Sequence, residues 1–236
     1  MFQTLIIDKI MSNKKLFLSL IYSSLALLIL VSLGTWQLER LRWKTDILSS
    51  MKESLSLPPL KITDQVIDNI GQYSFRRIQL TGNYLYKNNI TIYSKVLNKK
   101  VGKHLIVPLE TKYGIILVNR GFIPSDFNIE NNIKSGEISI NGIVKFQQKI
   151  NYFTPNNNVI KNEWYYININ EVSNFISLPL LNFYVVEENN IEEKYPVGSQ
   201  YNINIPNDHL QYAITWFSLA LALCIFINIF WRKNVS

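Results

Sequence analysis

The chain has 236 residues, a formal net charge of +7, two histidines and one cysteine. With Cys224 alone, an intrachain disulfide and a cysteine-based zinc site are excluded. The positive charge is mild and suits a protein beside anionic lipid. It forms no basic cluster in the middle of the chain, so we expect no nucleic-acid partner.

The first apolar run covers residues 16–33 and is interrupted only by Ser and Tyr. It is longer than the core of a signal peptide, which spans about 7–15 residues. We therefore predict a retained transmembrane helix over residues 16–33, after a cytoplasmic N-terminus of residues 1–15. A cleaved signal peptide is the alternative, because Ser32-Leu33-Gly34 partly matches a small-residue cleavage site.

A second apolar run covers residues 212–231, close to the roughly 20 residues that a helix needs to cross a bilayer. Arg232 and Lys233 follow it, and no Lys or Arg lies between Tyr195 and Trp231. This asymmetry predicts a cytoplasmic C-terminus at residues 232–236. Two crossings then put residues 34–211 outside, in the periplasm of a bacterium or the intermembrane space of a mitochondrion.

The segment between the two runs predicts a mainly antiparallel β (α+β) domain. Residues 36–51 are expected to continue the first helix until Pro58-Pro59 ends it, and residues 64–70 to form a short helix. β-Branched and aromatic residues then indicate strands. We expect strands at residues 76–84, 90–97, 104–110, 115–122, 137–148, 164–169 and 182–188, a helix at 171–176, breaks at Gly82-Asn83, residues 98–102, Tyr113-Gly114 and Asn141-Gly142, and an extended return over residues 195–206.

Few residues suggest catalysis. There is no glycine-rich phosphate loop, and neither His104 nor His209 lies in the sequence context of a nucleophilic site. An enzyme that uses carboxylates alone stays open but is not favoured. We expect His104 to be a partly buried strand residue, and Arg120 to form a structural salt bridge before a turn at Gly121.

Four segments in order are similar to the surfeit locus protein 1 family, the assembly factors of cytochrome c oxidase. Asp208 stands where the family more often has Asn, Phe122 stands where Trp is common, and residues 136–182 match loosely. The resemblance covers residues 33–220 and rests on four blocks: Leu33-Gly34-Thr35-Trp36-Gln37-Leu38-Glu39-Arg40 with Trp43-Lys44, Gly102-Lys103-His104-Leu105-Ile106-Val107-Pro108-Leu109, Leu117-Val118-Asn119-Arg120-Gly121-Phe122-Ile123-Pro124, and Asn207-Asp208-His209-Leu210-Gln211-Tyr212-Ala213-Ile214-Thr215-Trp216-Phe217.

The resemblance implies a non-enzymatic assembly factor in the inner membrane of a bacterium. Such a protein assists the binding of haem a and its insertion into cytochrome c oxidase subunit I. The implied partners are subunit I, haem A synthase and the lipid bilayer.

The same resemblance implies a transient haem a site at the outer mouth of the second helix. His209 would be the axial iron ligand, because neutral imidazole binds haem iron well. Trp36 and Trp216 would flank the macrocycle beside Tyr212. Arg40, helped by Arg42 and Lys44, would pair with the propionates.

Simpler readings of these residues stay open. Tryptophans at this depth also serve as interfacial anchors, and the basic residues can meet lipid phosphates. The main functional alternative is a membrane scaffold that stabilises subunit I without binding haem itself. A receptor whose outer domain binds a small ligand is a third.

Overall fold

The computed structural model describes residues 2–147, 150, 152–189, 194–201 and 206–235, with side chains from residue 17 onward except at 131–132 and 234–235. The chain divides into two compact units. The helical unit combines Met1–Ser50 with Asn204–Ser236, and the β unit is Met51–Ile203.

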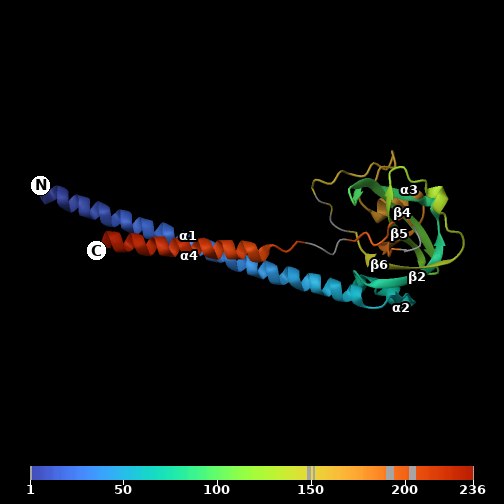
Figure 1. Cartoon of the computed structure of the whole chain (residues 1–236), viewed down its shortest axis with the longest axis horizontal. Coiled ribbons are helices and arrows are strands. Elements are labelled where there is room, and N and C mark those ends of the chain that lie inside the picture. Colours follow the sequence, from blue (N-terminus) through green and yellow to red (C-terminus); the bar gives the residue numbers. More distant parts are fainter. Residues whose placement is uncertain (1, 148–149, 151, 190–193, 202–205, 236) are drawn as a thin grey trace. The chain divides into compact units, whose positions relative to one another are not determined.

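Two long helices make the helical unit. Helix α1 spans Phe2–Ser56 and helix α4 spans His209–Val235. Both are long and apolar enough to cross a membrane. They run antiparallel and side by side, with the two chain ends at the same end of the pair (Figure 1). The predicted continuation of the first helix is confirmed, and α1 ends just before Pro58-Pro59.

Small residues lie where α1 and α4 meet. Ala213 and Ala220 are buried, and Gly34 faces the ring of Phe217. Glycine and alanine allow two helix backbones to approach closely, as in membrane helix pairs. Large apolar side chains such as Leu28 and Phe226 are instead exposed to the outside of the pair, which suits a lipid environment.

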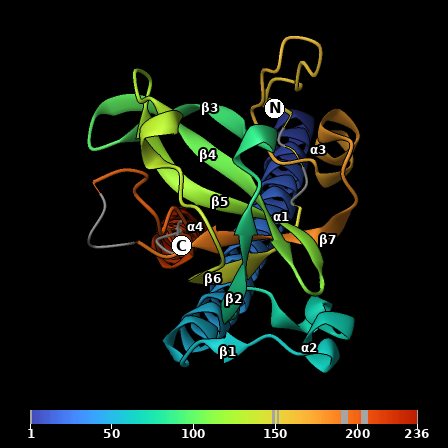
Figure 2. The ribbon, with the colours of Figure 1, turned by 90° about the vertical axis from the view of Figure 1, so that its right-hand side faces the viewer.

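The β unit is built on a closed barrel (Figure 2). The sheet order is β1-β2-β6-β7-β5-β4-β3, and a further pairing of β2 with β4 closes the five strands β2, β6, β7, β5 and β4 on themselves. The pairs β1–β2 and β5–β7 are parallel, and the others are antiparallel. The strands are β1 (Leu60–Lys61), β2 (Arg77–Tyr84), β3 (Ile90–Leu97), β4 (Lys100–Thr111), β5 (Gly114–Pro124), β6 (Ile138–Lys145) and β7 (Leu180–Glu187).

Alternation along the strands produces two apolar cores. One face of each of the five closed strands contributes to the first core, which includes Leu80, Val107, Val118 and Phe183. The second core lies on the other face of β3, β4 and β5, where Trp164 and helix α3 (Ile169–Ile176) cover it. Strands with both faces covered need the near-continuous apolar sequence that β4 and β5 have.

The short helices begin at side-chain caps. Thr63 accepts a hydrogen bond at the start of α2 (Asp64–Asp68), and Asn168 does so at the start of α3. Such caps satisfy amide groups that lack a partner within the helix. Short 3-10 turns cover Ile70–Tyr73, Tyr86–Asn88 and Ile129–Asn132.

Most predicted strands are confirmed to within a few residues, but one predicted strand and three predicted breaks are wrong. Residues 164–169 are not a strand: Trp164 forms one isolated bridge with Ile92, and Asn168 already caps α3. The predicted breaks at Gly82-Asn83 and Asn141-Gly142 lie inside β2 and β6, and only Asn98-Lys99 of the predicted break at residues 98–102 separates β3 from β4. Part of the predicted extended segment 195–206 lies outside the described residues.

Both strand glycines are explained by close backbone approach. A Cβ on Gly82 would lie 2.2 Å from the carbonyl oxygen of Glu110, where β2 meets β4. A Cβ on Gly142 would lie 2.8 Å from the carbonyl oxygen of Val186 on β7. Glycine within a strand often marks such an approach, so it did not signal a turn here.

Candidate functional site

The first site residue, His209, opens helix α4 and contacts α1. Its Nδ1 lies 2.7 Å from Oε1 of Gln37. Because a carbonyl oxygen can only accept, the Nδ1–H of His209 is the donor. The other ring nitrogen, Nε2, then carries a lone pair in the neutral imidazole. An imidazole held in this way is the form that binds a metal.

Two further contacts tie the entry of α4 to α1. The side-chain amide of Asn207 donates to the hydroxyl of Thr45 at 3.2 Å, and the ammonium group of Lys44 donates to the carbonyl of Pro206. Together with the Gln37 contact they connect two places on α1, about two helical turns apart, to the segment that begins α4. The position of His209 is therefore fixed by several hydrogen bonds.

The predicted aromatic and basic residues lie on the same two helices. Arg40 stacks between two rings of α1, with its guanidinium carbon 5.9 Å from the Trp36 centroid and 4.8 Å from that of Trp43. Cation–π contacts of this kind leave the N–H groups at the guanidinium edge available to an anion. Trp36 is about half exposed.

On α4, Tyr212 and Trp216 follow His209 by one and two helical turns. Tyr212 is mostly exposed and Trp216 is half-buried. Lys44 is half-buried and engaged with Pro206, whereas Arg42 is exposed. The structure thus places every predicted site residue in the helical unit, and it adds Gln37. Gln37 was missed because its partner is 172 residues away in the chain.

The three residues of the block Asn119-Arg120-Gly121 contact three different parts of the β unit. A bulge sets Ile106 opposite Asn119 and Leu105 opposite Gly121, so Arg120 is the extra residue. Asn119 points to His104 on one face of β5, and Arg120 points to Glu187 on the other. Gly121 has φ 114°, and a Cβ there would lie 1.9 Å from the carbonyl oxygen of Val197.

Arg120 forms the buried ion pair that was predicted for it. Its Nε lies 3.2 Å from Oε2 of Glu187, and its Nη1 donates to the Tyr86 hydroxyl at 2.8 Å. The guanidinium also stacks on Tyr84, whose hydroxyl donates to Glu187. Burial, reinforced by the Glu187 carboxylate, raises the pKa of Tyr84. This cluster is structural.

His104 is a partly buried residue of β4, as predicted. Burial, with a smaller contribution from the nearby Lys95 ammonium, lowers the pKa of His104 to about 4. Its imidazole is therefore neutral near pH 7. The Nδ1 atom of His104 lies 3.3 Å from the amide nitrogen of Asn119.

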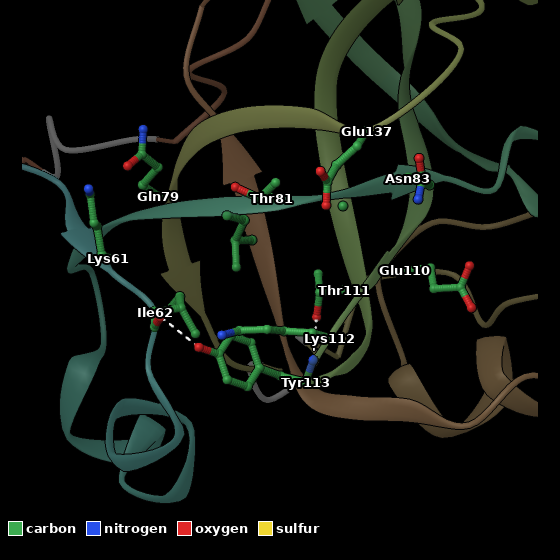
Figure 3. Close-up of a pocket in the computed structure, with 12 residues that line it drawn as sticks. Lys61, Ile62, Gln79, Thr81, Asn83, Glu110, Thr111, Lys112, Tyr113 and Glu137 are labelled. Carbon is green, nitrogen blue, oxygen red and sulfur yellow. Dashed lines mark hydrogen bonds between the residues drawn. The ribbon is translucent and has the colours of Figure 1, made fainter.

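A cavity of about 660 Å³ lies where β2 and β4 part (Figure 3). The Tyr113 hydroxyl closes one side by donating to the carbonyl of Ile62 at 2.8 Å. Two lysines and two glutamates line it, Lys61, Lys112, Glu110 and Glu137, so its charges balance. None of the predicted site residues lies there, and the cavity is best described as the open seam of the barrel.

The sequence is similar to known proteins over most of its length. Residues 24–221 match the model of the SURF1 family, which is well over half of the chain. The chain belongs to the SURF1 family.

Relatives of this SURF1 family member come from bacteria and animals. A SURF1-like protein of Rickettsia conorii is 31% identical over 220 residues, which cover 88% of this chain and 89% of the relative. A SURF1-like protein of Rickettsia bellii is 32% identical over 89% of this chain and 88% of the relative. Surfeit locus protein 1 of Gallus gallus is 26% identical over 80% of this chain and 68% of the relative. The chain resembles the bacterial members.

Proposed function

We propose that this SURF1 family member is a non-catalytic assembly factor of cytochrome c oxidase. It would assist the binding of haem a and its insertion into subunit I. The observation that carries this proposal is the hydrogen bond from His209 Nδ1–H to Gln37 Oε1, which leaves the lone pair of Nε2 available for an iron. The family membership supports an assembly role.

The surrounding residues fit a haem group. The haem group would supply three features: an apolar ring, two anionic propionates and an iron to which Nε2 of His209 can bind. Trp36 and Trp216 offer aromatic surface for the ring, beside Tyr212. Arg40, held between Trp36 and Trp43, offers edge N–H groups for a propionate.

The proposed location follows from the helices. The last turn of helix α4 carries Arg232 and Lys233, and this pair of positive charges favours a cytoplasmic C-terminus. The β unit would then lie in the periplasm of a bacterial inner membrane. A reporter that is active only in the periplasm, fused at Asn157, should be active, and activity of a cytoplasmic reporter there would contradict this topology.

The proposed partners are subunit I, haem A synthase and the bilayer. A scaffold that holds subunit I without haem is the competing function. It predicts a colourless protein that still co-purifies with subunit I.

An absorption spectrum separates the two functions. We expect the full chain, co-expressed with the enzymes that make haem a, to purify with a Soret band. His209→Ala should lose most of the haem while staying in the membrane, and His104→Gln is the control because His104 lies in the β unit. A His209→Ala protein with full haem and an unchanged spectrum would contradict the ligand assignment.

A further inference from the structure

A second cavity lies in the β unit, on the face of β3, β4 and β5 that Asn119 and His104 share. It measures about 330 Å³. We propose that this cavity binds a small carboxylate with a flat apolar body, held by Lys95 and His104. The site is separate in residues and chemistry from the proposed haem site at His209.

A bulge in β3 aims Lys95 into the cavity. Ile92 pairs with His104 and Lys95 pairs with Gly102, so Tyr93 and Ser94 together oppose one residue of β4. Side chains three positions apart in a regular strand point to opposite faces. The bulge, with Ser94 at φ 58°, brings both Ile92 and Lys95 into the lining of one cavity. Bulges are common beside functional sites because they redirect a side chain in this way.

Asn119 sets the direction in which His104 donates. Its Oδ1 accepts from the backbone N–H of Gly121 at 3.0 Å, which leaves its amide nitrogen facing His104 Nδ1 at 3.3 Å. The neutral imidazole therefore accepts at Nδ1 and carries its proton on Nε2. Nε2–H is a donor for a ligand oxygen.

The charge of the lining selects an anion. Among the described residues around this cavity, Lys95 carries the one full charge and no carboxylate is present. Burial lowers the pKa of Lys95, which means that its ammonium group lacks full solvation. A bound carboxylate would supply the missing counter-charge through a charge-assisted hydrogen bond.

The rest of the lining mixes apolar and polar side chains. Ile92, Ile167 and the rings of Tyr165 and Tyr184 offer apolar surface to a flat ring, and Gln147, Thr154 and Gln200 add neutral polar groups. Burial raises the pKa of Tyr184 to about 12, so its hydroxyl stays protonated and can donate. Such a mixed lining lets a small molecule bind through both ring contacts and hydrogen bonds.

The two histidines make a direct test possible. Full-length protein labelled with ¹⁵N-histidine gives imidazole signals from His104 and His209 alone. We expect benzoate to shift the His104 Nε2 signal saturably and to leave His209 as an internal reference. Benzyl alcohol, which has the same ring without the charge, and inorganic phosphate should bind much more weakly.

Matched lysine variants test the charge. Lys95→Gln should weaken benzoate binding by about tenfold or more, as expected for the loss of a hydrogen bond to a charged group. Lys103→Gln removes a neighbouring charge that lies over Tyr93 and does not line the cavity, and it should change binding less than about twofold. The proposal is overturned if His104 shows no saturable shift, if benzyl alcohol or phosphate binds as well as benzoate, or if both lysine variants bind alike.

Discussion

The ring of Phe217 on α4 fills the space beside Gly34 on α1. A Cβ at Gly34 would lie 2.7 Å from two carbons of that ring, closer than real side chains approach. Gly34 and the buried Ala213 therefore set how closely the two helices pack. The same closeness lets Gln37, one turn after Gly34, reach His209.

Gly34→Leu should separate the helices. The larger side chain must displace Phe217, and overpacking of this kind typically costs about 1–3 kcal/mol. Spin labels at the exposed residues Glu39 and Leu210, in a background with Cys224→Ser, should report a longer and broader distance distribution. Ser32→Leu, at an exposed position of the same helix, is the control and should leave the distribution unchanged. An unchanged distribution in Gly34→Leu would show that the glycine does not set the spacing.

Gln37→Leu should weaken haem retention while leaving the proposed iron ligand, His209, in place. The imidazole keeps Nε2 but loses the partner that fixes its proton on Nδ1, and loss of such a partner typically costs about 10–100-fold in metal affinity. Haem transfer to an apo-acceptor protein, followed by absorbance, measures the change. Gln37→Glu retains an acceptor and should bind more tightly than Gln37→Leu. Equal retention by the two variants would mean that Gln37 does not orient His209.

Arg120→Ala should destabilise the β unit strongly. It leaves the Glu187 carboxylate buried without its cation, which typically costs about 3–5 kcal/mol. Arg77→Ala is the matched control, since its pair with Glu188 is partly exposed, at 29% and 22% for the two side chains. A pair of that kind contributes about 1 kcal/mol or less. Denaturant unfolding of both variants should separate them clearly, and similar losses would argue against a special role for the buried pair.

Gly121→Ala should disrupt the local structure of β5 although it adds only one methyl group. The residue has φ 114°, and its Cβ would collide with the carbonyl of Val197, which is backbone and cannot rotate away. The variant should lose the paired hydrogen bonds between Phe122 and Val197. Amide hydrogen exchange at Phe122 reports this directly. Gly71→Ala has open space around its Cβ and should leave exchange unchanged.

His104 should make the β unit less stable at mildly acidic pH. Its pKa is about 4 in the folded protein, against the ordinary value of 6.5. The unfolded chain therefore binds a proton that the folded one does not, and this difference lowers stability as pH falls from 6.5 to 4. The loss is up to roughly 3 kcal/mol.

His104→Gln should remove that part of the pH dependence. The difference in unfolding free energy between wild type and variant, measured from pH 7 to pH 4, isolates the histidine from the carboxylates. Lys95→Gln should raise the pKa of His104, because it removes the nearby positive charge. A wild-type protein and a His104→Gln variant with parallel pH profiles would contradict the buried, neutral imidazole.

Local sequence determined which elements form. The two long apolar runs define the helices, Pro58-Pro59 follows the end of α1, and alternating β-branched and aromatic residues mark the strands to within a few positions. The blocks shared with the family also include His209 and Arg120. These signals are local, because hydrophobic period and turn chemistry act within a few residues of one another.

Only the tertiary structure decided which residues meet. Gln37 and His209, Arg120 and Glu187, and Lys95 and His104 come together through pairings between elements that are distant in the chain, or through bulges that change the face of a side chain. The predicted strand breaks at Gly82 and Gly142 were wrong for the same reason. Glycine is needed at both positions because the backbone of another strand approaches closely, and the local sequence of a strand does not show which strand lies beside it.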